Sequence, residues 1–168
     1  MDSEDADSAR RRGGSAAVDP KDQGSWRELG EGAAGRVAVL SIHPQYADGI
    51  LEGTKTVEFR RWRLAADVRT VVIYATKPVG RVVGSFNVGG VHEGTPGELW
   101  RECAANGGIG RAAYENYFRG TARAFAIIVE GVRRLGEPLA LTDLHPDLVP
   151  PQSVRYLEGL EHPDLLEA

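Results

Sequence analysis

Strands and helices do not alternate regularly along this sequence. Hydrophobic periodicity predicts strands over residues 37–42, 54–60, 69–76, 81–91 and 121–134. Helices are predicted over residues 44–52, 96–103 and 110–119. A doubly wound parallel sheet needs helices that alternate with its strands, so this order argues against that class. It favours an α+β fold in which a small, mostly antiparallel β-barrel is capped by helices.

Turn and capping signals set the predicted helix boundaries. Pro44 suits the first turn of a helix, and Gly53 suits the residue that ends it. Thr95, Pro96 and Glu98 have the spacing of a capping box with proline at the first helical position. These signals fix where two of the helices start.

The two ends of the chain differ from its middle. Residues 1–36 are rich in Gly, Ala, Ser, Asp and Arg and have almost no apolar periodicity. Such a segment cannot bury enough apolar surface to offset its ordering entropy, so we expect it to be disordered. One folded domain is predicted at residues 37–157, followed by an acidic tail at residues 158–168.

Composition limits the class of protein. The 168 residues suffice for one domain, and 42% hydrophobic and 26% charged residues are usual for a soluble one. The single cysteine, Cys103, excludes an intramolecular disulfide and fits a reducing compartment. No apolar run approaches the roughly 20 residues of a membrane helix, and no secretory signal pattern is present. We therefore predict a cytoplasmic protein with no membrane partner.

Charge is unevenly distributed. The formal net charge is −4, yet residues 37–134 hold thirteen lysines and arginines against nine aspartates and glutamates. A basic body within an acidic chain is compatible with nucleic-acid or nucleotide binding. It is equally compatible with unpatterned surface charge.

Motifs for metals, phosphates and nucleophiles are not found in the sequence. The histidines show no zinc-ligand spacing to one another or to Cys103. The glycines of GSFNVGG lack the spacing and the following Lys-Ser/Thr of a phosphate-binding loop. No metal and no cofactor are therefore expected.

Five segments carry a family resemblance: LSIHPQYADGILEGTKTVEFRR, VIYATKPVGRVVGSFNVGGV, GTPGELW, GTARAFAI and PPQSVRYL. In this order, and over residues 37–157, they resemble the ASCH domain family of the PUA-like superfamily. The resemblance implies a β-barrel with a cleft beside it, in which family members are proposed to bind RNA or nucleotides. Some branches look enzymatic, including amidohydrolases of acetylated cytidine and metal-dependent ribonucleases.

The most specific part of the resemblance is the string Gly-x-Lys-x-x-Glu-x-Arg at Gly53, Lys55, Glu58 and Arg60. Glu58 and Arg60 are two residues apart on a predicted strand, so they project from one face. A carboxylate can accept hydrogen bonds from a base edge, and arginine can bind phosphate or stack on a base. Alternatively, Lys55 is a surface lysine and the other two residues form an internal ion pair that orders the barrel mouth.

Residues near the string and near the end of the chain are candidates for the same site. Trp62 offers a flat surface for an unpaired base beside Arg61, or it is a partly buried plug. Tyr74 and Lys77 are placed beside the cleft, with core packing as the alternative for the tyrosine. The resemblance implies that PPQSVRYL folds back near the signature strand, which makes Ser153 and Arg155 candidates for the pocket rim, or it only fastens the C-terminus.

An enzymatic hypothesis uses some of these residues. In the amidohydrolase branch the lysine works with a threonine three residues later, but that position here is Glu58, so the resemblance does not carry the nucleophile over. Hydrolysis of RNA or of an acylated nucleoside would use Lys55 as base and Glu58 or Glu98 to activate water or bind a metal.

The leading hypothesis is an RNA- or nucleotide-binding, regulatory module that holds a single-stranded base in the cleft. Its expected ligand-binding residues are Lys55, Glu58, Arg60, Arg61, Trp62, Tyr74, Lys77, Ser153 and Arg155. The alternatives are the hydrolase and a protein-interaction module that has lost its ligand.

Overall fold

The computed structural model describes residues 35–158, 160 and 162–166. Nearly all of the segment predicted to be disordered, residues 1–36, lies outside the described residues. The elements in chain order are β1 (Arg36–Ile42), α1 (Pro44–Glu52), β2 (Val57–Arg60), β3 (Val68–Ala75), β4 (Arg81–Gly94), α2 (Pro96–Cys103), the 3-10 turn η1 (Ala104–Asn106), α3 (Arg111–Tyr117), β5 (Ala124–Leu139), α4 (Leu141–Leu144), β6 (Val154–Leu157) and α5 (Pro163–Leu166).

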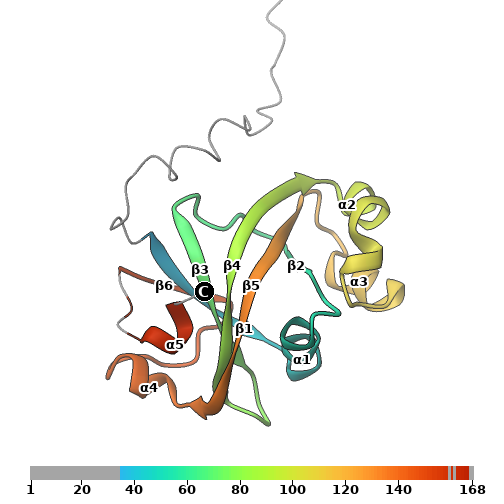
Figure 1. The fold of residues 1–168 in the computed structure, drawn as a ribbon. Coiled ribbons are helices and arrows are strands. Elements are labelled where there is room, and N and C mark those ends of the chain that lie inside the picture. The colour runs from blue at the N-terminus through green and yellow to red at the C-terminus, as the bar shows by residue number, and fades with distance from the viewer. Residues whose placement is uncertain (1–34, 159, 161, 167–168) are drawn as a thin grey trace, which may run out of the picture. The chain divides into compact units, whose positions relative to one another are not determined.

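The strands form one mixed sheet in the order β2-β5-β4-β3-β1-β6 (Figure 1). β1 pairs with β3 in parallel, and the other pairings are antiparallel. A parallel pairing needs a long crossover, and α1 together with β2 provides it. The predicted α+β, mostly antiparallel architecture is confirmed.

The backbone ladder does not run on from one edge strand, β2, to the other, β6. Side chains join the two edges instead. Arg60 at the end of β2 donates to the backbone carbonyl of Ser41 in β1, and Trp62 donates to the hydroxyl of Ser153 just before β6. The sheet is therefore barrel-like, with a polar seam where its edges meet.

Three apolar clusters pack on the curved sheet. The central one lies between α1 and the sheet and includes Leu40, Ile50, Ile73, Phe86 and Ile127. A second is covered by α4 and α5, and a third by α2 and α3. In Figure 1, α2 and α3 lie at one end of the sheet, and α4 and α5 lie near the other end.

The predicted starts of α1 and α2 are confirmed, whereas the helix predicted at residues 110–119 is the shorter α3 (Arg111–Tyr117). Pro44 begins α1, and Gly53 ends it with a left-handed backbone, at φ 82°. At the start of α2, Thr95 Oγ1 accepts from the Glu98 N–H at 3.2 Å, and Glu98 Oε2 accepts from the Thr95 N–H at 2.8 Å. This is the capping box that the sequence predicts.

The region expected to be an acidic tail contributes to the core. α5 lies in it, and Leu165 is fully buried in the second apolar cluster. The backbone carbonyl of Leu165 accepts from the buried Ser85 hydroxyl at 2.6 Å. Among the described residues, no helix is long and apolar enough to cross a lipid bilayer.

Candidate functional site

The signature string spans the link from α1 into β2. The backbone N–H of Lys55 donates to the Gly49 carbonyl of α1 at 2.9 Å, which sets the lysine at the end of the helix. β2 then pairs with β5, so that Glu58 lies opposite Ile127 and Arg60 opposite Phe125. Glu58 and Arg60 therefore share a face of the strand, as predicted.

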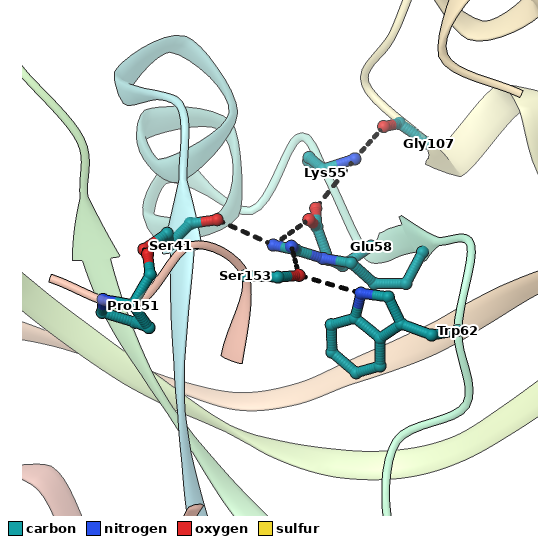
Figure 2. Close-up of polar contacts among 8 residues, drawn as sticks. Ser41, Lys55, Glu58, Trp62, Gly107, Pro151 and Ser153 are labelled. Atoms are coloured by element: carbon teal, nitrogen blue, oxygen red, sulfur yellow. Dashed lines mark hydrogen bonds and ion pairs between the residues drawn. The ribbon is translucent and has the colours of Figure 1, made fainter. Parts of the chain in front are cut away.

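Lys55, Glu58 and Arg60 form a compact ionic cluster, named here the buried triad. Glu58 Oε2 lies 3.4 Å from Lys55 Nζ, and Glu58 Oε1 lies 3.0 Å from Arg60 Nη2. Figure 2 shows the carboxylate of Glu58 below the ammonium of Lys55. The side chains are only 3%, 8% and 9% exposed, respectively. The triad thus holds two cations and one anion out of water, with one positive charge in excess.

Backbone and hydroxyl groups complete the coordination of the two cations. Lys55 Nζ donates to the carbonyl of Gly107 (Figure 2). Arg60 donates to the Ser41 carbonyl at 3.0 Å and to the Ser153 hydroxyl at 3.3 Å. The same hydroxyl accepts from the Trp62 indole N–H at 2.8 Å. Ser153 is therefore a shared acceptor for two donors from the β2 edge.

One buried donor of the triad has no partner among the described residues. The Nε of Arg60 is inaccessible to solvent and makes no hydrogen bond. An unmade hydrogen bond of this kind is unfavourable, and native structures seldom retain one without a reason. The triad therefore has an unused donor as well as an unbalanced positive charge.

Aromatic rings surround the cations. Lys55 Nζ lies 5.3 Å from the ring centre of Tyr46 and 5.4 Å from that of Phe59, and the Arg60 guanidinium lies 5.6 Å from that of Trp62. These distances are in the range of cation–π attraction. Tyr46 also lines an open hollow of about 460 Å³ at the start of α1, together with His43, Pro44 and Gln45. The Tyr46 ring therefore lies next to both the hollow and the buried Lys55 ammonium.

Burial changes the proton affinity of the lysine. Loss of hydration lowers the pKa of Lys55, and the charge of Arg60 lowers it further, while Glu58 opposes both. A lysine with a lowered pKa gives up its proton more readily and can then act as a base. The site therefore combines excess positive charge with a candidate proton acceptor.

Comparison with known proteins identifies the fold. The sequence profile of the ASCH domain matches residues 40–134. The chain belongs to the ASCH domain family. One relative, named "ASCH domain-containing ribonuclease", comes from Zymomonas mobilis. It is 33% identical over 128 residues, which cover 74% of this chain and 86% of the relative.

Solved ASCH structures agree with this assignment. The crystal structure of ASCH from Zymomonas mobilis superposes with a TM-score of 0.64 at 32% identity, over 72% of this chain and 87% of that one. Structures of its tyrosine-to-phenylalanine and serine-to-alanine variants each give a TM-score of 0.66. The expected PUA-like, barrel-like fold is thus confirmed.

The ASCH domain places several predicted residues outside the buried triad. Tyr74 is buried in the second apolar cluster, while Lys77 and Arg155 are exposed. The Glu98 carboxylate is the acceptor of the α2 capping box. Among the contacts of the described residues, none joins these four to the triad. Of the other predicted residues, Trp62 and Ser153 contact it directly, and Arg61 stacks on Tyr117, 5.0 Å from the ring centre.

A second ionic cluster lies near the end of β2 and is named here the exposed triad. Glu93 at the end of β4 pairs with Arg63 at 2.7 Å and also with Arg123. The side chains of Arg63, Glu93 and Arg123 are 40%, 26% and 63% exposed, respectively. It has the same composition of two cations and one carboxylate as the buried triad, but it is open to water.

Four residues that contact the triad were not among the predicted site residues: Tyr46, Phe59, Gly107 and Ser41. Tyr46 and Phe59 contribute aromatic rings near the Lys55 ammonium, and Gly107 and Ser41 contribute hydrogen-bond acceptors. The last two contribute backbone carbonyls, which leave no side-chain signal. Among the described residues, no three His, Cys, Asp or Glu side chains gather closely enough to hold a metal ion.

Proposed function

We propose that this ASCH domain binds single-stranded RNA beside the buried triad and cleaves its backbone, with Lys55 as the general base. The observation that carries the proposal is a buried lysine of lowered pKa within a cluster that has one positive charge in excess. A phosphodiester supplies the missing negative charge. The name of the Zymomonas mobilis relative, a ribonuclease, supports the same reaction.

In the proposed reaction, the RNA phosphate binds while Lys55 is protonated and the triad carries its excess charge. Lys55 then loses that proton to water, and the neutral Nζ accepts the proton of a ribose 2′-hydroxyl. The 2′-oxygen bonds to the adjacent phosphorus, the bond from phosphorus to the 5′-oxygen breaks, and that oxygen takes a proton from water. Arg60 stabilises the charge that develops on the phosphate oxygens. Tyr46 and Ser153 flank this position, and a tyrosine and a serine are the residues replaced in the relative's variant structures.

The decisive experiment measures cleavage of a short unstructured RNA by mass spectrometry, with and without a divalent cation. We expect Lys55→Arg to lower the cleavage rate by about 10²- to 10⁴-fold, because arginine keeps the charge but does not release its proton. Lys77→Arg is the matched control, because Lys77 is exposed in the turn after β3. Binding of a 2′-O-methyl RNA, which cannot be cleaved through the 2′-oxygen, reports whether each variant keeps its site.

The pH dependence gives a second test. As pH rises through the pKa of Lys55, the neutral amine becomes the major form and the cleavage rate should increase. Because burial lowers this pKa, the inflection should lie below the ordinary lysine value of roughly 10.4. A rate that is independent of Lys55 would contradict the assigned base.

Binding without cleavage is the second candidate function. The near-complete burial of all three triad side chains favours this candidate, because a buried Lys55 does not reach a ribose hydroxyl. The ion pairs of the triad then order the barrel seam beside which RNA binds. In that case wild-type protein would bind both RNA and its 2′-O-methyl analogue and cleave neither. A protein that binds neither would contradict both candidates.

A further inference from the structure

Access to Lys55 is blocked in the structure. Its side chain is 3% exposed, and Glu58 and Arg60 are buried with it. A ligand or a proton acceptor that meets the ammonium must therefore replace something that covers it.

Two segments cover the lysine. On one side is α1, where Tyr46 faces the ammonium and a Cβ added at Gly49 would lie 3.2 Å from the Cβ of Lys55. This helix is fixed in the core by Ala47 and Ile50, which are 1% and 0% exposed. On the other side is the segment Asn-Gly-Gly-Ile-Gly at residues 106–110, which runs from the last residue of η1 to the start of α3.

The segment 106–110 lies directly on the lysine because it lacks side chains there. A Cβ at Gly108 would come within 2.8 Å of the Lys55 Cβ, and Gly108 has a φ of +57°, which favours glycine. A Cβ at Gly107 would come within 2.4 Å of the Phe59 ring. Gly110 differs, because a Cβ there meets nothing within 4 Å.

Two hydrogen bonds hold this segment against β2. The Asn106 carbonyl accepts from the Thr56 N–H at 2.9 Å, and the Gly107 carbonyl accepts from Lys55 Nζ. Three of its five residues are glycines, whose backbone adopts other conformations readily. Ile109 of this segment packs against the third apolar cluster, while the part that lies on Lys55 is glycine backbone held by these two hydrogen bonds.

We propose that residues 106–110 are a lid, and that the Gly107 carbonyl oxygen occupies the place that a phosphate oxygen takes when a ligand binds. An anionic oxygen is a stronger acceptor for an ammonium than a carbonyl oxygen is, so the exchange favours the ligand. The phosphate also meets the excess positive charge of the buried triad. The ligand class rests on the proposed function, whereas the motion of the lid does not.

Hydrogen exchange of wild-type protein tests the lid without RNA. Thr56 bonds in two directions, because its N–H donates to Asn106 in the lid and its carbonyl accepts from the Val129 N–H at 3.0 Å in β5. If the lid opens by itself, the Thr56 amide should exchange at least about tenfold faster than the Val129 amide, because only the latter needs the sheet to open. Equal rates for the two amides would overturn the lid.

Lysine acylation followed by mass spectrometry gives an independent measure. The chain has three lysines, and exposed Lys77 serves as the internal reference for buried Lys55. Gly108→Ala should raise the acylation rate of Lys55 relative to Lys77 by about tenfold, because the added methyl group prevents closure. Gly110→Ala is the matched control and should leave the ratio unchanged, and circular dichroism shows whether each variant is folded. A folded Gly108→Ala protein with an unchanged ratio would contradict the lid, and wild-type exchange decides the question if that variant does not fold.

The placeholder role is tested with a 2′-O-methyl RNA trinucleotide. If its phosphate displaces Gly107, Thr56 should exchange faster in the complex while acylation of Lys55 slows. Slower exchange at Thr56 in the complex would overturn the displacement. If the trinucleotide does not bind, the placeholder role fails together with the proposed function, while fast wild-type exchange at Thr56 still supports the lid.

Discussion

The buried and the exposed triads have the same chemistry and different surroundings. Each places one carboxylate, Glu58 or Glu93, between two cationic side chains. The buried carboxylate is 8% exposed and the other is 26% exposed, while Arg123 of the exposed triad is 63% exposed. Water and salt can replace the partners of the exposed triad but not those of the buried one.

The net stability that an ion pair contributes therefore differs from the stability that is lost when one of its partners is removed. A buried ion pair adds little net stability over a well-packed apolar group, yet removal of one partner leaves a charge in a medium of low polarity. An exposed ion pair contributes little to stability, and removal of one of its partners also costs little. We therefore expect the buried triad to be sensitive to every single substitution, and the exposed triad to tolerate most of them.

Replacement of the central carboxylates should show the largest contrast. Glu58→Gln leaves Lys55 and Arg60 buried without their anion, so we expect a loss of about 3–5 kcal/mol in the free energy of unfolding. Urea denaturation followed by circular dichroism measures it. A loss below 1 kcal/mol, on the scale of an exposed pair, would show that water reaches the site freely.

Loss of the shared hydroxyl should have an intermediate effect. Ser153→Ala removes the acceptor of both the Trp62 indole and one Arg60 nitrogen. Unsatisfied buried donors typically destabilise by about 1–3 kcal/mol. Thr142→Ala removes a hydroxyl at an exposed position of α4 and is the control. Equal unfolding free energies of the two variants would mean that the seam is not held through Ser153.

Glu93→Gln in the exposed triad should change stability by no more than about 1 kcal/mol. Arg63 and Arg123 keep their contact with water, so neither is left with an uncompensated charge. The same urea titration measures the effect. A loss as large as that of Glu58→Gln would remove the distinction between the two triads.

Salt should affect the two triads differently, although this is the smallest change. At 1 M salt the screening length falls to about 3 Å, which weakens interactions between exposed charges most. The small effect of Glu93→Gln should therefore vanish, while that of Glu58→Gln should persist. Melting temperatures at low and high salt provide the comparison, and a parallel decline of both effects would contradict it.

Much of the fold could be predicted because its signals are local. The capping box at Thr95 and Glu98, the stop at Gly53 and the β-forming run before Ala75 each depend on a few neighbouring residues. β6 was not predicted as a strand. It is four residues long and is held by its pairing with β1, so its own residues give too little pattern to predict a strand.

The two triads also differ in how far apart their residues lie in the sequence. Lys55, Glu58 and Arg60 lie within six residues of one another, so the spacing of a strand placed two of them on one face. Arg63, Glu93 and Arg123 come from three segments, and the pairings of β2 and β4 with β5 bring them together. Glu98 shows the converse case, because its sequence supports both a cap and a remote acid, and its carboxylate accepts the hydrogen bond of the predicted cap.

Closure of the seam depends on the order in which the ribosome makes the chain. Ser153, the last of the described residues to contact the triad, follows Arg60 by 93 positions. A ribosome that adds about 5–20 residues per second needs on the order of 5–20 s to make the intervening chain. During that interval a nascent chain already contains Lys55, Glu58 and Arg60 but cannot close the seam over them. The complete site therefore exists only after translation has passed residue 153.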